Sequence, residues 1–280
     1  MTFRDPRVLL KAHGLWTKKR FGQNFLIDPT VPERIARAGG VSGRSKVVEI
    51  GSGCGTLTQV LGESGAAVIA LEYDRDLIPV ARAELAQWPQ VEVREANVLD
   101  TVWPALADEL GGPLLIYGNL PYHLSSPIIF GLLEVSSAWE RACFMVQREF
   151  AQRLVARPGE RAAGSLSVHA ALWTQSTMLF EVPPESFYPS PKVHSAVVVI
   201  ERRAKPAVHI DDQKTFNQLV KTLFAQRRKM SRKTLKLICE DVPALLDAAG
   251  VDGMRRGEEF ELWELAELAN ALTSLRRAES

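Results

Sequence analysis

The chain has 280 residues, enough for one large domain or for a large and a small domain together. With 46% hydrophobic and 24% charged residues, the composition is that of a folded globular protein and excludes a disordered one. The net charge of +1, taken alone, argues against a nucleic-acid binder, and no apolar run is long enough to cross a membrane. The beginning of the chain lacks the apolar stretch of a secretory signal. The three cysteines lie far apart, which indicates reduced thiols and neither disulfides nor a zinc site, so we expect a cytoplasmic protein.

Apolar segments that alternate with helical patterns predict a series of strands at 46–50, 67–72, 91–94, 114–117 and 142–146. Helices are predicted between them, for example over 76–87 and 125–134. Such alternation predicts an α/β fold, with a mostly parallel sheet that helices cover on both faces. A late β-branched segment, Ser195–Glu201, follows a proline-rich stretch and no helix, so we expect it to be antiparallel.

The pattern changes after Arg203. Lys205-Pro206 resembles a linker, and only helical patterns follow it, over 212–226, 231–239, 243–249 and 259–275. We therefore predict an α/β domain over residues 1–204 and a small all-helical domain over residues 205–280.

Positive charge is concentrated in two places. A basic N-terminal arm ends in Lys18, Lys19 and Arg20, and the segment 221–236 contains no acidic residue. Clustered cations of this kind bind phosphate backbones, so both patches are predicted to contact nucleic acid. The alternative is that each patch is only a solvated helix face. The predicted contact residues of the second patch are Arg227, Arg228, Lys229, Arg232 and Lys233.

A glycine turn, Gly51-Ser52-Gly53-Cys54-Gly55, lies between the first predicted strand and a helix that begins near Thr56. The third glycine comes one residue too early for the dinucleotide fingerprint, which favours a nucleoside that carries an amino-acid tail. Glu72 ends the second strand, where an acid can accept both ribose hydroxyls, and Asn97 follows the third, where a carboxamide can bond an adenine edge. The alternative is a structural turn with Glu72 and Asn97 merely exposed.

The tetrapeptide Asn119-Leu120-Pro121-Tyr122 follows the fourth predicted strand. The asparagine oxygen and the neighbouring carbonyl oxygen can accept the two N–H bonds of a flat exocyclic amine. The proline fixes the turn, and the tyrosine offers a face on which a base can stack. Taken alone, the tetrapeptide is equally compatible with an ordinary strand-to-loop turn.

The stretch from Glu49 to Thr58 resembles the first motif of class I S-adenosylmethionine methyltransferases. Further segments are similar, in the same order, to the rRNA adenine dimethyltransferase family, and they lie at 19–26, 119–122, 145–149, 164–168, 186–193 and 224–229. The helical C-terminal part resembles the 16S rRNA branch of that family. The resemblance implies a Rossmann-like fold with a seven-stranded sheet and S-adenosylmethionine as cofactor. It also implies a monomer that needs no metal and dimethylates two adjacent adenines in a loop near the 3′ end of 16S rRNA, in the assembling small subunit.

The resemblance also implies roles for individual residues. Asn119 and the Leu120 carbonyl would hold the target amine beside Pro121, while Tyr122 and Phe187 would stack on the two faces of the base. For Phe187 an ordinary core position is the alternative. Gln23 would lie over the amino-acid end of the cofactor and Glu49 near its ammonium group. The full predicted cofactor set is Gln23, Asn24, Leu26, Glu49, Gly51, Gly53, Gly55, Glu72, Tyr73, Asn97, Val98 and Asn119.

Two positions depart from the family pattern, which usually has proline at Ser52 and aspartate at Asn97. A carboxamide lacks the charge assistance of a carboxylate, about 1 kcal/mol, so we expect weaker cofactor binding but not inactivity. Three other functions stay open: a 23S rRNA adenine methyltransferase, an rRNA-binding assembly factor without catalysis, and an NAD-dependent oxidoreductase. The glycine spacing and the lack of a hydride-transfer acid oppose the last.

Overall fold

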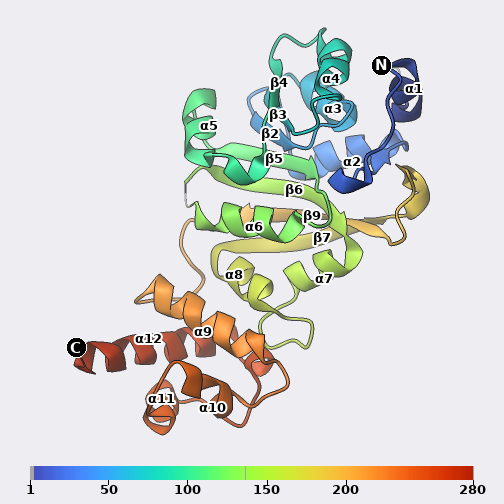
Figure 1. Cartoon of the computed structure of the whole chain (residues 1–280). Coiled ribbons are helices and arrows are strands. Elements are labelled where there is room, and N and C mark those ends of the chain that lie inside the picture. The colour runs from blue at the N-terminus through green and yellow to red at the C-terminus, as the bar shows by residue number, and fades with distance from the viewer. Residues whose placement is uncertain (1–2, 136, 280) are drawn as a thin grey trace. The chain divides into compact units, whose positions relative to one another are not determined.

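The structure is a computed structural model that describes residues 3–135 and 137–279. Its contacts divide the chain into two compact units (Figure 1). The first unit comprises the chain up to Ala151 together with Thr177–Arg202, and the second comprises Gln152–Ser176 and the chain from Arg203 onward. The longer segment of the second unit begins at Arg203, close to the expected linker, and the unit also includes residues 152–176, which the sequence pattern assigns to the α/β domain. All three cysteines are free thiols.

A seven-stranded sheet organises the fold, in the order β4-β3-β2-β5-β6-β9-β7. The first five strands of that order pair in parallel, and β6 pairs with β9 antiparallel, as predicted. The sequence analysis missed β7, because only its two end residues are buried and its interior is polar or half-exposed. The strand bounds are β2 (Lys46–Ile50), β3 (Ala67–Glu72), β4 (Val91–Glu95), β5 (Leu114–Asn119), β6 (Trp139–Gln147), β7 (Thr174–Val182) and β9 (Ser195–Arg202).

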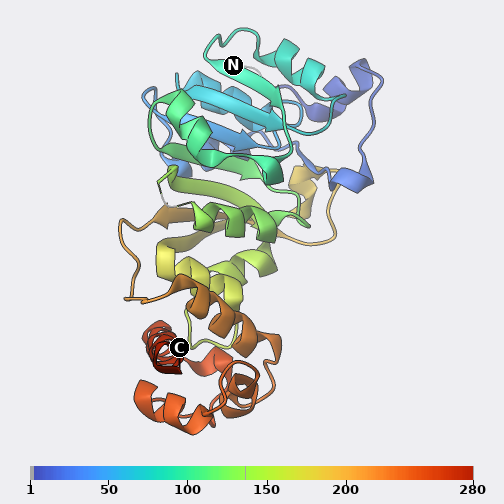
Figure 2. The ribbon, with the colours of Figure 1, turned by 60° about the vertical axis from the view of Figure 1, so that its left-hand side comes forward.

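Helices cover both faces of this sheet. Alternate strand residues such as Val47 and Val68 pack in one cluster with residues of α2 (Thr30–Gly39) and α3 (Thr56–Glu63). Residues of the opposite parity, such as Ile116, are equally buried. Burial of both faces is what a mostly parallel sheet requires. The remaining helices of this part are α1 (Pro6–Ala12), α4 (Ile78–Leu85), α5 (Trp103–Leu110), α6 (Ser125–Glu134) and α7 (Arg148–Val155), and their course can be followed in Figures 1 and 2.

A small second sheet joins distant parts of the chain. The strand β1 (Phe25–Leu26), at the end of the N-terminal arm, pairs antiparallel with β8 (Phe187–Tyr188). This pairing holds the end of the arm, defined as the N-terminal segment up to Leu26, against the body of the first unit.

The second unit is helical, as predicted for the chain beyond residue 205. Its core includes Val168 and Leu172 from α8 (Ser165–Trp173), which pack with α9 (Gln213–Ala225). This apolar contact explains why residues 152–176 belong here. The other elements are α10 (Ser231–Thr234), the 3₁₀ turn η4 (Leu235–Leu237), α11 (Val242–Ala249), the 3₁₀ turn η5 (Gly257–Glu259) and α12 (Leu262–Glu279). Within the described ranges, no helix is both long and apolar enough to span a membrane.

Candidate active site

A pocket of about 380 Å³ opens in the first unit at the carboxyl ends of β2, β3, β4 and β5. The sheet order reverses between β2 and β5, which is where open parallel sheets bind ligands. The arm segment from Arg20 to Leu26 forms one wall. Of the predicted cofactor set, only Gly55 does not line the pocket, and Asn119, Leu120, Pro121 and Tyr122 all line it. Sequence motifs that lie far apart therefore meet in one cavity.

The glycine turn forms the floor of the pocket. Gly53 has a φ of 58°, a left-handed conformation that favours glycine, and a Cβ there would lie 3.1 Å from the Phe25 ring. The Glu72 carboxylate holds this turn by accepting the Gly53 N–H at 2.7 Å. Its other oxygen accepts the N–H groups of Tyr73 and Asp74 at 2.8 and 2.7 Å. Glu72 is thus a structural organiser of the pocket as well as the predicted ribose acceptor.

Glu49 lies at the pocket wall with its carboxyl group buried. Its side chain is only 2% exposed, and Oε2 has no hydrogen-bond partner among the described residues. Burial, with a smaller contribution from the charge of Glu72, raises the pKa of Glu49 to about 8. An ammonium group beside Oε2 would satisfy this buried atom. The residues present therefore fit a ligand with an amino-acid tail, as the sequence predicts.

Asn97 lines the pocket, but its side chain is already engaged. Its oxygen accepts the Leu99 N–H at 3.2 Å and so caps the short turn η2 (Val98–Asp100). Its amide nitrogen donates to Asp100 Oδ2 at 2.8 Å. A carboxamide oxygen has two lone pairs, so one remains for the predicted adenine contact.

Asn119 ends β5 with its side-chain amide in a fixed orientation. The Nδ2 group donates to the Asn24 carbonyl oxygen at 2.8 Å, so Oδ1 must be the atom that is presented to a substrate. Among the described residues, neither Oδ1 nor the Leu120 carbonyl oxygen accepts a hydrogen bond. Gly118 allows this strand end to approach β2, since a Cβ there would lie 2.7 Å from the Ile50 carbonyl oxygen. Two adjacent residues that line the pocket thus each carry a free acceptor.

Tyr122 is half-buried at the pocket and fixed by its hydroxyl, which lies 2.8 Å from Ser195 Oγ. Burial raises the pKa of this tyrosine, against the effect of the Ser195 contact. A ring held at its hydroxyl end is a suitable stacking surface, because little side-chain entropy is left to lose. The sequence analysis did not anticipate Ser195, which lies at the start of β9.

Phe187 is not brought to the pocket. It is 3% exposed and packs in the core cluster with Leu26 and Val31, as a consequence of the β1–β8 pairing. This placement matches the core alternative considered for Phe187, and its stacking role stays a prediction. Gly55 also lies outside the lining, with its Cβ direction facing Leu85.

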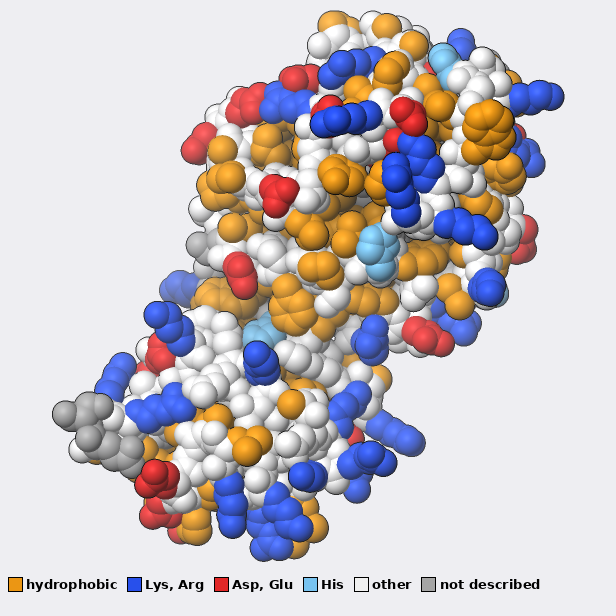
Figure 3. All heavy atoms as spheres, viewed as in Figure 1, with side chains coloured by type: hydrophobic (Ala, Val, Ile, Leu, Met, Phe, Trp, Pro, Cys, Tyr) orange, Lys and Arg blue, Asp and Glu red, His pale blue; other side chains and the backbone are white. Residues whose placement is uncertain are grey.

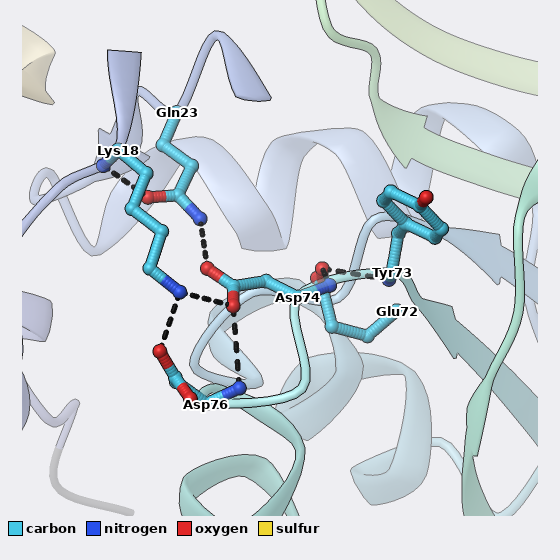
Figure 4. A network of polar contacts seen from close by, with 6 residues as sticks. All are labelled: Lys18, Gln23, Glu72, Tyr73, Asp74 and Asp76. Carbon is cyan, nitrogen blue, oxygen red and sulfur yellow. Dashed lines mark hydrogen bonds and ion pairs between the residues drawn. The ribbon is translucent and has the colours of Figure 1, made fainter. Parts of the chain in front are cut away.

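The N-terminal arm is bound to the loop after β3 by a polar network (Figure 4). Lys18 Nζ forms ion pairs of 2.5 Å with both Asp74 and Asp76. The Gln23 amide nitrogen donates to Asp74 Oδ2 at 2.8 Å, while its oxygen accepts the Lys18 N–H at 2.7 Å. Lys18 was predicted to anchor RNA, but its charge is neutralised inside the protein. Lys19 and Arg20 are exposed.

The basic segment of the second unit is a turn followed by the short helix α10 and the 3₁₀ turn η4, which lie within the helix expected over 231–239. Arg227 is engaged internally, with Glu258 at 3.0 Å and the carbonyl oxygens of Arg161 and Ala163 at 2.9 and 2.8 Å. Four further predicted RNA contacts in this segment are exposed: Arg228, Lys229, Arg232 and Lys233. Figure 3 shows Lys and Arg side chains gathered on this unit.

Asp74 is another residue that the sequence analysis missed. The only local signal for it is its position, two residues after Glu72 at the end of a predicted strand. Among the described residues, no cluster of histidine, cysteine and acidic side chains could hold a metal ion.

This fold and this pocket define a Rossmann-like methyltransferase of class I type. The sequence model of the family described as "Ribosomal RNA adenine dimethylase" matches residues 15–265. The protein named ribosomal RNA small subunit methyltransferase A from Magnetococcus marinus is 46% identical, over 94% of this chain and 95% of that protein. The protein of the same name from Myxococcus xanthus is 40% identical, over 99% and 98%. The chain belongs to the ribosomal RNA adenine dimethylase family.

Solved structures agree on the fold. The 23S rRNA methyltransferase ErmE has a TM-score of 0.70 at 27% identity, over 89% of this chain and 100% of that one. A dimethyladenosine transferase from Plasmodium falciparum has a TM-score of 0.72 at 22% identity, over 87% and 95%.

Proposed function

We propose that this protein transfers methyl groups from S-adenosylmethionine to the N6 amines of two adjacent adenines near the 3′ end of 16S rRNA. Family membership and the names of the most similar relatives support an rRNA adenine substrate in the small subunit. We further propose that the enzyme acts as a cytoplasmic monomer on the assembling subunit and needs no metal.

The observation that carries the proposal is the orientation of Asn119. With Nδ2 bound to the Asn24 carbonyl, Oδ1 and the adjacent Leu120 carbonyl oxygen are both free to accept N–H bonds. An adenine N6 amine has two such bonds, and holding both would turn its lone pair toward the cofactor pocket. The two oxygens would also stabilise the positive charge that develops on the nitrogen.

The bound sulfonium cofactor supplies an electrophilic methyl group. Glu49 would hold its ammonium group, and Glu72 and Asn97 its ribose and adenine. Tyr122 would stack on the target base, which must leave its own stack to enter the pocket. No strong base is required, because the proton can leave to solvent after transfer. In the second round one N–H remains, so the pocket must tolerate one lost hydrogen bond and one added methyl group.

The exposed residues Lys19, Arg20, Arg228, Lys229, Arg232 and Lys233 are proposed to contact the rRNA backbone. Lys18 and Arg227 are left out of this proposal, because both are held by partners within the protein.

Methyl transfer to under-methylated small subunits tests the proposal, with naked 16S and 23S rRNA assayed in parallel. We expect dimethyladenosine in 16S rRNA. Transfer to 23S rRNA alone would favour the activity named for ErmE, to which the fold is similar. Tight binding without incorporation would favour an assembly factor.

A further inference from the structure

Asp74 lies at the junction between the cofactor pocket and the N-terminal arm (Figure 4). Its side chain is only 4% exposed, although it is charged. Oδ1 accepts from Lys18 Nζ at 2.5 Å and from the Asp76 N–H at 3.2 Å, and Oδ2 accepts from Gln23 Nε2 at 2.8 Å. Its own N–H donates to Glu72 Oε1 at 2.7 Å. The Asp74 carboxylate is therefore surrounded by hydrogen-bond donors, and the residue contacts both the arm and the cofactor pocket.

The contacts made by Asp74 determine the position of the arm. Gln23 cannot turn its amide around, because its oxygen accepts the Lys18 N–H and its nitrogen must then face Asp74. A second contact lies beside this network, where the rings of Phe21 and Tyr73 meet edge to face at 5.8 Å. The next residue after Gln23 is Asn24, whose carbonyl oxygen orients the Asn119 amide at 2.8 Å. A short chain of contacts thus connects Asp74 to Asn119.

We propose that Asp74 is a positioning residue for methyl transfer, which holds the arm so that Asn24 presents the Asn119 oxygen to the target amine. The inference rests on the proposed function, because it assigns Asp74 an effect on that reaction. Without the arm, the Asn119 amide could rotate and place its nitrogen where the amine needs an acceptor. Because the Asp74 backbone N–H donates to Glu72, arm docking and the shape of the cofactor pocket are linked through one residue.

Asp74→Asn is the direct test. The substituted amide nitrogen would face a donor in either orientation, Lys18 Nζ in place of Oδ1 or Gln23 Nε2 in place of Oδ2, so the network cannot close even though the side-chain volume is preserved. Arg75→Gln is the matched control, because Arg75 is the next residue, its side chain is 80% exposed, and among the described residues its ion pair is with Glu95. Lys18→Met removes the ion pairs with Asp74 and Asp76 from the arm side of the network, and Lys18→Arg should restore them.

Three readouts separate positioning from a general structural role. In the cofactor-free protein, Asp74→Asn should speed trypsin cleavage after Lys18, Lys19 and Arg20, with the cut identified by mass spectrometry. In steady-state assays on small subunits, kcat should fall about 10- to 100-fold while KM for the subunit changes less than about threefold. In an Asn119→Ala background, Asp74→Asn should have little further effect, since both act through the same amide.

Fully additive losses in the double variant, or unchanged cleavage of the arm in Asp74→Asn, would overturn the inference. If Asp74→Asn fails to fold, Lys18→Met and its Lys18→Arg rescue answer the same question. Should the wild-type protein fail to methylate rRNA, the proposed function would be lost, whereas the cleavage readout would still decide whether Asp74 holds the arm.

Discussion

Replacing Asn119 by alanine removes the acceptor that the structure orients most precisely. The loss of one preorganised dipole aimed at developing charge lowers kcat by about 10²- to 10³-fold, or about 2.7–4 kcal/mol. The same change leaves the Asn24 carbonyl oxygen without its 2.8 Å partner. Because this hydrogen bond is only partly buried, the free energy of unfolding should fall by about 0.5–1.5 kcal/mol. The predicted effect is therefore large on the reaction and small on the fold.

Steady-state methyl transfer to under-methylated small subunits measures kcat, and urea unfolding measures the free energy of unfolding. The Kd values for S-adenosylhomocysteine and for the subunit should stay within about threefold of the wild-type values, well below a tenfold loss of affinity. Asn217→Ala, an exposed asparagine on α9, is the control and should change nothing. A near-native kcat in Asn119→Ala would refute the proposed role of the amide oxygen.

Three further predictions follow from burial and pairing. With a pKa of about 8 in the free protein, Glu49 is protonated below that pH, so binding of S-adenosylhomocysteine should release up to one proton between pH 4.5 and 8. Calorimetry in two buffers measures this proton release, and the Glu49→Gln substitution should abolish it. Phe187→Ala should lower the free energy of unfolding by about 3–5 kcal/mol, because the side chain is buried. Phe187→Leu should keep most of kcat, and a folded Phe187→Leu protein without activity would instead indicate that Phe187 stacks on the base. Arg228→Gln should reduce the slope of log K against log salt for subunit binding by the amount expected for about one phosphate contact. Arg227→Gln should lower the thermal stability of the second unit and leave that slope unchanged.

Short-range sequence patterns were sufficient to predict most strands of the sheet, and most of the cofactor-binding residues named in the sequence analysis line the pocket. The strand over Lys46–Ile50, the glycine turn and the Asn119 tetrapeptide are short-range signals, and parallel strands bring their carboxyl ends to one edge whatever lies between them. The antiparallel pairing of β9 was predictable, because no helix precedes Ser195 that could carry the chain back across the sheet.

What could not be predicted depends on partners far away in the chain. Lys18 and Asp74 are 56 residues apart, and a lysine that is paired inside the protein looks in sequence like one that is free to bind RNA. The same holds for Arg227, whose partner Glu258 lies 31 residues away. Residues 152–176 join the second unit through the apolar face of α8, and only the packing of that face against α9 reveals it.

The central claim concerns which RNA is methylated. Primer extension over 16S and 23S rRNA, after incubation of under-methylated ribosomal subunits with the protein and S-adenosylmethionine, tests it most directly. We predict extension stops at two adjacent adenines near the 3′ end of 16S rRNA, which disappear when Asn119 is replaced by alanine. Stops in 23S rRNA alone, or the absence of any stop despite tight subunit binding, would contradict the account.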